Sequence, residues 1–328
     1  MASICKREFG THPRTIEYQR LSGWKPTGTF RVRLTLSGRR RVCVIFKNAL
    51  YLDEDIPALV GLPLAPGPPE WGVYQAKDDG LVGYLPRVYW MNEVTPGRHY
   101  RYLLEDLGEK YRRLDRRSET VVRLAANLSC LHQTFMSSGI SRQSELLLRY
   151  DEAFRRGLLE YAFRNIQTYA LRSTDSLVHE VVERWSEIAD LVGRSGPGGR
   201  LPPTLVHGDL NFANIMVSRR DDRDIKLIDW EWAGFAEPHA DLASLLKRAD
   251  PVLEAQAVRA YAGTDSRLGL DEHIGLYSWW QLQRGLLDAG FMAAQLGQDD
   301  YEGHLDRVGF VERSLQRVLG SHAVLSSA

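Results

Sequence analysis

The side chains best suited to chemistry lie in one segment of the 328-residue chain, between residues 205 and 246. Asp209 follows a short apolar stretch, Asn214 comes five residues later, and Asp229 stands at the end of the next apolar stretch. Hard oxygen ligands of this kind suit Mg²⁺ and are poor ligands for zinc. Phosphoryl transfer needs metal ions to neutralise the phosphates and a group that orients the nucleophile. The segment therefore predicts phosphoryl-transfer chemistry.

Three linked motifs in this segment resemble the aminoglycoside phosphotransferase and choline kinase superfamily. Its HxDxxxxN loop is matched by residues 207–214, which read HGDLNFAN. Its metal-binding Asp in an I-D-W/F-E context is matched by residues 228–231, which read IDWE. Its later glycine and D-L-A element is matched by Gly234 and by residues 237–243, which read EPHADLA. Three motifs in the right order are a specific signal, whereas the HGD tripeptide alone is weak.

The resemblance implies a role for each matched residue. Asp209 would be the catalytic base or would orient the acceptor hydroxyl. Asn214 and Asp229 would bind Mg²⁺. His207 and Asp241 would support the loop through hydrogen bonds, and for His207 this structural role is favoured over direct chemistry. For Asp229 a ligand role is favoured, because a carboxylate beside a Trp is costly to bury unless it is paired or binds a cation.

The resemblance also implies a nucleotide site for ATP, with GTP as a possibility. Lys47 would bind its phosphates and pair with a Glu, which we expect to be Glu70 with Glu54 as the alternative. The backbone of Glu105 and Leu107 would bind the adenine. The sequence departs from the family of protein kinases in the loop that covers the nucleotide, because only Gly23 and Gly28 stand in place of G-x-G-x-x-G.

The acceptor is poorly specified by the sequence. In the family the acceptor lies against helices that face the catalytic loop. The candidate residues here are Asn211, Glu231, Trp232, Trp280 and Arg284, and Trp279, Gln283 and Asp288 are further candidates near them. At least one of the two adjacent Trp residues is expected to belong to the core. The leading hypothesis is a small-molecule acceptor: an aminoglycoside or other antibiotic, an aminoalcohol or a sugar.

Two other functions stay open at this point. The same core could phosphorylate Ser or Thr of a peptide or protein. A nucleotide-binding pseudokinase that serves as a scaffold is the second, although a scaffold has no need of Lys47, Asp209, Asn214 and Asp229 together.

The elements that must position these residues divide into two parts. Alternating apolar residues predict strands over residues 16–21, 29–36, 42–47, 85–90 and 100–104, with a short helix at 70–76 and a loop at 57–69. Helical spacing begins near Glu119, is interrupted by a linker at 193–203, and returns from Leu242 after three short strands at 204–206, 215–217 and 225–228. We predict an α+β, protein-kinase-like bilobal fold: an N-lobe with an antiparallel sheet and the hinge (1–107) and a mostly helical C-lobe (108–328).

Composition excludes some partners. Lys plus Arg and Asp plus Glu each total 42, so the net charge of zero indicates neither nucleic acid nor an anionic membrane as a partner. Three scattered cysteines indicate reduced thiols. The charged start MASICKREFG and the lack of a long apolar run argue against a signal peptide and a membrane span. A cytoplasmic protein is expected, and its oligomeric state is left open.

Overall fold

A computed structural model gives the structure of this protein. It describes residues 2–21, 28–50, 68–76, 79–96, 99–114, 118–137, 146–193, 201–296 and 304–326. Gly23, Glu54, most of the loop predicted at 57–69 and most of the linker predicted at 193–203 lie outside the described residues.

The N-terminal part is built on one antiparallel sheet of five strands, in the order β1-β2-β3-β5-β4. Its strands are β1 (Pro13–Arg20), β2 (Thr29–Leu36), β3 (Arg41–Leu50), β4 (Val88–Thr95) and β5 (His99–Glu105). The period of two in β2 buries Val32, Leu34 and Leu36 on one face, as the alternating sequence predicts. Edge strand β1 is largely exposed.

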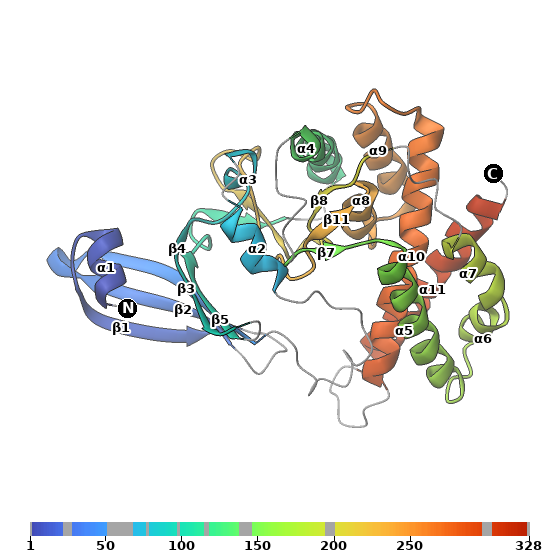
Figure 1. Ribbon diagram of the computed structural model, residues 1–328, viewed down its shortest axis with the longest axis horizontal. Coiled ribbons are helices and arrows are strands. Elements are labelled where there is room, and N and C mark those ends of the chain that lie inside the picture. The colour runs from blue at the N-terminus through green and yellow to red at the C-terminus, as the bar shows by residue number, and fades with distance from the viewer. Residues whose placement is uncertain are drawn as a thin grey trace.

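Helices cover both faces of this sheet (Figure 1). Helix α1 (Ala2–Phe9) buries Ile4 and Cys5 against β2 and β3. Helix α2 (Pro69–Gln75) packs Trp71 and Tyr74 against tyrosines of β5. The sequence interpretation missed α1 because a helix of eight residues is too short to be stable by itself, and this one is stabilised by packing against the sheet.

Several strand predictions differ from the structure in their bounds. The strand predicted at 16–21 lies at 13–20. The strand predicted at 85–90 lies at 88–95, because the short helix α3 (Asp79–Val82) and a turn occupy the residues before it. Strand β3 continues to Leu50, so Lys47 lies inside the strand and not at its end. There Lys47 is paired with Thr29 of β2 and Tyr102 of β5, which fixes its backbone on both sides.

The rest of the chain is mostly helical. Its helices are α4 (Ser118–Ser137), α5 (Glu152–Ala170), α6 (Ser176–Glu183), α7 (Trp185–Gly193), α8 (His239–Leu246), α9 (Pro251–Ala262), α10 (Leu270–Leu296) and α11 (His304–Ser326). Helix α10 is central and packs against α5, α8 and α11 (Figure 1). Among the described helices, none combines the length and the apolar character that crossing a bilayer requires.

Six short strands form two small sheets beside these helices. One sheet has the order β10-β9-β6 and the other β7-β11-β8. Their bounds are β6 (Tyr111–Arg113), β7 (Leu148–Arg149), β8 (Thr204–Val206), β9 (Ile215–Ser218), β10 (Ile225–Leu227) and β11 (Gly234–Ala236). The predicted strands at 204–206, 215–217 and 225–228 are therefore present with nearly the same bounds.

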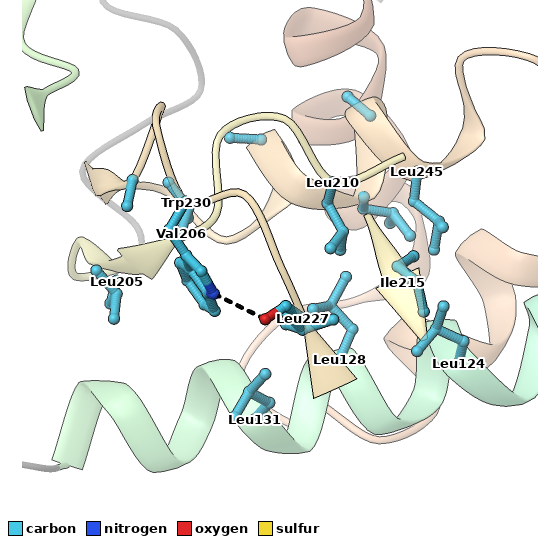
Figure 2. Packing of buried hydrophobic residues seen from close by; sticks show 14 of the residues in the cluster. Leu124, Leu128, Leu131, Leu205, Val206, Leu210, Ile215, Leu227, Trp230 and Leu245 are labelled. Carbon is cyan, nitrogen blue, oxygen red and sulfur yellow. Dashed lines mark hydrogen bonds between the residues drawn. The ribbon is translucent and has the colours of Figure 1, made fainter. Parts of the chain in front are cut away.

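The main core lies under these short strands. Figure 2 shows leucines of α4 (Leu124, Leu128 and Leu131) packed against Leu205 and Ile215 of the strands. Trp230 is buried in the same cluster, and its indole N–H donates to the carbonyl of Leu227 at 3.0 Å. Burial of one such side chain stabilises the fold by about 1.5–3 kcal/mol. The loops between these strands are thus anchored at both ends.

Candidate active site

Asp209 lies in the loop between β8 and β9, flanked by the buried residues Val206 and Leu210 (Figure 2). The preceding residue, Gly208, has φ +78°, which an L side chain rarely adopts. A Cβ there would also collide with the carbonyl oxygen of Trp232 and the hydroxyl of Tyr150. The glycine is required by this turn, and the turn brings the loop close to the β10–β11 connection.

Asp241 of α8 holds the start of this loop. Its two carboxylate oxygens accept the backbone N–H groups of His207 and Gly208, both at 2.8 Å. The carboxylate is almost fully buried and also contacts His132 of α4 at 3.2 Å. His207 in turn lies with Nε2 2.9 Å from the carbonyl oxygen of Ile228. His207 and Asp241 therefore occupy the supporting positions that the sequence predicted.

The carboxylate of Asp209 is held by positive side chains. Its Oδ1 contacts Nη2 of Arg284 on α10 at 2.7 Å and Nζ of Lys247 at 3.4 Å. Burial on its own would raise the pKa of Asp209, but Arg284, Lys247 and His207 outweigh it and lower the pKa to about 2. Such a carboxylate is a weak base at neutral pH, so this environment suits orienting a hydroxyl better than removing its proton early.

Asn214 connects Asp209 with the next hairpin. Its side-chain amide donates to the backbone carbonyl oxygen of Asp209 at 2.9 Å. The backbone carbonyl of Asn214 accepts the N–H of Ile228 at 3.0 Å. Asp229 follows Ile228 and has φ +68°, the only non-glycine residue with positive φ among those described. Backbone strain of this kind occurs mainly where a side chain must be aimed at a functional site.

Lys47 joins the sheet to this hairpin. Its Nζ lies 2.7 Å from Glu70 Oε2, 2.7 Å from Asp229 Oδ1 and 3.2 Å from Glu231 Oε1. Burial would lower the pKa of Lys47, but the three carboxylates outweigh it and hold the pKa well above its usual value. Glu70 is therefore the acidic partner of Lys47 in this structure, as expected from the sequence.

Glu70 is fixed from two sides. It is 3% exposed, and its second oxygen accepts the hydroxyl of Tyr74 one turn later in α2 at 3.1 Å. Burial raises the pKa of Glu70, while Lys47 acts in the opposite direction. One oxygen atom from each of Glu70, Asp229 and Glu231 lies within 4.8 Å of the others, so this cluster could hold a cation.

A cleft of about 650 Å³ separates the sheet from the β9–β10 hairpin. Its apolar walls include Ile45 and Leu104 on one side and Met216 and Ile228 on the other. The polar residues Lys47, Glu70, Asn214, Asp229 and Glu231 gather at one part of its lining. An apolar slot beside a cluster of charged groups has the form of a nucleotide site.

The predicted hinge residues Glu105 and Leu107 also line this cleft. The N–H of Glu105 donates to the carbonyl of Arg87 at 2.8 Å, and the carbonyl of Leu107 accepts from Lys110 and Tyr111. These two groups are thus engaged within the protein. Gly28 lines the cleft as well.

The acceptor candidates are divided by the structure. Glu231 lines the nucleotide-sized cleft, whereas Arg284 lines a second cavity of about 690 Å³ beside Asp209. Asn211 donates to Asp209 Oδ2 at 3.0 Å. Trp232 is half-buried against Leu148 and Phe154.

The two adjacent tryptophans belong to the core. Trp279 and Trp280 are both buried, and Trp280 donates to Glu237 at 3.0 Å. Neither lines the cleft or the second cavity. The expectation that at least one of them is a core residue is confirmed. Gln283 is buried too, whereas Asp288 lines the second cavity.

Sequence reasoning missed Lys247 and His132. Lys247 follows the last residue of α8 and reaches Asp209 across 38 positions of the chain. His132 on α4 reaches Asp241 across 109 positions. Neither residue stands in a motif, and an amphipathic helix predicts which face is buried but not which distant polar group it meets. The spacing of the sequence carried no signal for either contact.

A family model shows which family this chain belongs to. The model of the family described as "Phosphotransferase enzyme family" matches residues 63–273, which include Glu70, the catalytic loop and α8. This chain belongs to that family.

Solved structures of the same architecture have low sequence identity. The chain is similar to choline kinase LicA from Streptococcus pneumoniae, with a TM-score of 0.58, 14% identity and 95% of each chain covered. It is also similar to spectinomycin phosphotransferase APH(9)-Ia in complex with ADP and spectinomycin, with a TM-score of 0.57, 12% identity and 98% and 97% of the two chains covered. These likenesses confirm the predicted α+β, protein-kinase-like fold with an antiparallel sheet and a mostly helical second part.

A curated relative matches a shorter stretch. Acyl-CoA dehydrogenase family member 11 of Rattus norvegicus is 28% identical over 85 residues, which are 26% of this chain. The match spans only 11% of the length of that protein.

Proposed function

We propose that this protein transfers the γ-phosphate of ATP to a hydroxyl group of a small molecule. The observation that carries the proposal is the ion pair of Lys47 with Glu70 and Asp229 in a cleft that Asn214 also lines, next to Asp209. A lysine, an amide and several carboxylates stand beside one slot, and phosphoryl transfer requires groups of these kinds to bind phosphates and a metal and to orient a hydroxyl.

The proposed nucleotide site uses the whole cleft. The base would lie between Ile45, Leu104 and Met216, with its edge at the backbone of Glu105 and Leu107. The triphosphate would extend toward Lys47. GTP is the alternative nucleotide. Backbone N–H and C=O groups can distinguish adenine from guanine only by the hydrogen-bond donors and acceptors on the edge of each base.

The oxygen donors near Lys47 fit Mg²⁺. Asn214 and Asp229 offer an amide and a carboxylate oxygen, and Asp229 is half exposed and therefore accessible from the cleft. Glu231 offers a third oxygen nearby. Mg²⁺ prefers such hard ligands together with phosphate oxygens. When bound, it would neutralise charge on the phosphates.

Asp209 would receive the acceptor hydroxyl. The bond between the γ-phosphorus and the oxygen bridging to the β-phosphate breaks, a bond from the γ-phosphorus to the acceptor oxygen forms, and ADP leaves. The hydroxyl proton passes to Asp209 or to solvent as that bond forms. The carboxylate is ionised at neutral pH because its pKa is low, so it is ready to accept the hydrogen bond.

Substitution of Asp209 tests this assignment. We expect Asp209→Asn to reduce acceptor-dependent ADP release by at least about 10³-fold, a typical loss for a group that acts on the reacting atoms. Its affinity for Mg·ADP should stay within about twofold of wild type, because Asp209 does not line the nucleotide cleft. Turnover would be measured by coupled ADP detection, and nucleotide binding by calorimetry.

Asp222→Asn is a matched control, since Asp222 is an exposed partner of Arg123 and lines neither cavity. Turnover of the Asp209→Asn variant at the wild-type rate would refute its role. Nucleotide binding without any acceptor turnover in the wild type, over antibiotics, aminoalcohols, sugars and peptides, would favour the scaffold.

A further inference from the structure

The second cavity lies beside the catalytic loop and has no assigned ligand. It measures about 690 Å³ and is bounded by the end of α8, the start of α9, and facing surfaces of α10 and α11. On α10 its lining residues recur at positions 281, 284, 285 and 288, which is the spacing of one helix face. The cavity is therefore a built groove between packed helices.

The charge of this cavity is strongly positive. Five of its described lining residues are cationic and two are acidic: Lys247, Arg248, Arg284, Arg313 and Arg317 against Glu254 and Asp288. Arg284 and Lys247 pair with two carboxylates: that of Asp288, at 3.0 and 3.7 Å, and that of Asp209, at 2.7 and 3.4 Å. Within the part of the chain that the structure describes, Arg313 and Arg317 form no ion pair; Arg317 donates to the carbonyls of Leu246 and Ala249. Cationic side chains therefore outnumber carboxylates in the lining of the cavity.

The same cations reach the catalytic carboxylate. Arg284 donates to Asp209 Oδ1 and to the carbonyl of Gly208, and Lys247 contacts the same carboxylate oxygen. Both side chains are only 14% exposed. Burial and the neighbouring Arg284 lower the pKa of Lys247 even though Asp288 and Asp209 act in the opposite direction. Asp209 and Asp288 balance these two cations, so the excess of positive charge in the cavity comes from Arg248, Arg313 and Arg317 against Glu254, and an anion would offset it.

Resting on the proposed phosphotransferase function, we propose that this cavity binds the anionic end of the acceptor, a hydroxyl compound that carries a carboxylate or a phosphate group. Such a group would accept hydrogen bonds from the guanidinium groups of Arg284 and Arg317 and from Lys247. Arginine forks bind planar and tetrahedral oxyanions in a bidentate manner. The hydroxyl of the same molecule then lies near Asp209.

A cationic acceptor does not fit this charge pattern. Choline or an aminoglycoside would have to leave water and enter a groove where positive side chains outnumber carboxylates. Like charges at short range cost several kcal/mol in a partly desolvated site. The cavity therefore selects against the aminoalcohols and amino sugars and in favour of acids.

A matched set of acceptors tests this inference. Glycerate, glycerol phosphate, glycerol and choline all carry a primary or secondary hydroxyl and differ in charge. With Mg·ATP and wild-type protein, we expect acceptor-dependent ADP release with at least one of the two anions, and kcat/KM at least about tenfold above that of glycerol and of choline. Comparison of glycerate with glycerol phosphate shows whether the cavity prefers a carboxylate or a phosphate group on the acceptor.

A binding experiment separates this inference from the proposed function. Each anion is titrated into protein already saturated with Mg·ADP, which keeps the anion out of the nucleotide cleft. We expect Arg313→Glu to weaken anion binding by at least about tenfold, and Arg313→Gln to weaken it less, because Arg313 is exposed at the rim and does not touch Asp209. The control is Arg259→Glu, an exposed arginine of α9 outside the cavity.

The outcomes are distinct. Anion binding that is weakened in the Arg313 variants and unchanged in Arg259→Glu supports the inference, whether or not the probe is turned over. Turnover of choline or glycerol at rates that exceed those of both anions overturns it and leaves the phosphotransferase function standing. Absence of anion binding at millimolar concentration also overturns it. Failure of Mg·ADP to bind would instead contradict the proposed function.

Discussion

Lys47 is the residue on which three acidic side chains converge. Glu70 approaches from α2, and Asp229 and Glu231 approach from the segment after β10. Without a cation between them these carboxylates would repel one another, since like charges at this range are unfavourable in a site of low polarity. Lys47 therefore stabilises this arrangement of the three carboxylates.

Asp209 provides a prediction on pH dependence. Its pKa of about 2 lies below the usual value of 3.8, because Arg284, Lys247 and His207 outweigh the effect of burial. Because this pKa is lower in the native protein than in the unfolded chain, the ionised carboxylate stabilises the native protein above pH ~4. This contribution to stability is lost as the pH falls toward ~2. We expect Arg284→Gln to raise the pKa of Asp209, so that the acid limb of kcat/KM moves to higher pH.

The measurement is a pair of pH–rate profiles at fixed Mg·ATP. Titration of ATP itself affects both proteins equally, so only the displacement between the profiles reports on Asp209. Arg259→Gln, which removes an exposed arginine of α9, should follow the wild-type curve. Coincident acid limbs in wild type and Arg284→Gln would show that Arg284 does not control the ionisation of Asp209.

At the level of elements, α8 acts as the support of the catalytic loop. Asp241 in its first turn accepts two loop N–H groups, and His207 continues the network to the β10–β11 connection. The helix itself is entirely buried, from His239 to Leu246. A loop held in this way cannot move without breaking charge-assisted hydrogen bonds in the interior, which are among the stronger ones in proteins.

Asp241→Asn tests this support. Loss of the charge weakens two buried hydrogen bonds, so we expect a cost of about 2–4 kcal/mol in the free energy of unfolding and a fall in kcat of at least about tenfold. The matched control is Asp250→Asn, because Asp250 also accepts two backbone N–H groups, as the N-cap of α9. It should lower the melting temperature and leave kcat unchanged at a temperature where the variant is folded. Equal losses of kcat in the two variants would contradict a specific role for Asp241.

Strands and motifs were more predictable than the contacts between elements. The alternation in residues 29–36 and the short apolar stretches at 204–206, 215–217 and 225–228 gave nearly the observed bounds, because each pattern is local. The parallel pairing of β7 with β11 was not predicted, since it joins residues more than 80 positions apart through two hydrogen-bonded positions. Helix α1 escaped notice for the same reason: its stability comes from the sheet.

For the whole molecule, the motifs located the groups of the site but not their mutual contacts. Lys47, Glu70, Asp209, Asn214 and Asp229 meet around one cleft or next to it, as the motifs indicated. The contacts of Lys247 and the cavity rich in cationic residues could not be predicted from the sequence, because α8, α10 and α11 approach one another only in the folded chain. The charge of a cavity is a property of that assembly, so a chain with no net charge can still have a cavity lined mainly by cationic residues.

The cleft between the two parts predicts how the whole molecule responds to nucleotide. Its walls come from the sheet and from the β9–β10 hairpin, so a ligand that contacts both is lost when either part unfolds. A ligand at a hundred times its Kd stabilises the native state by about 2.7 kcal/mol. We expect saturating Mg·ADP to raise the melting temperature of the wild type by at least about 3 °C, and to have little effect on Asp229→Ala in the presence of magnesium. Asp222→Ala, which removes an exposed partner of Arg123, should respond as the wild type does. An equal shift in wild type and Asp229→Ala would contradict the placement of the phosphates beside Asp229.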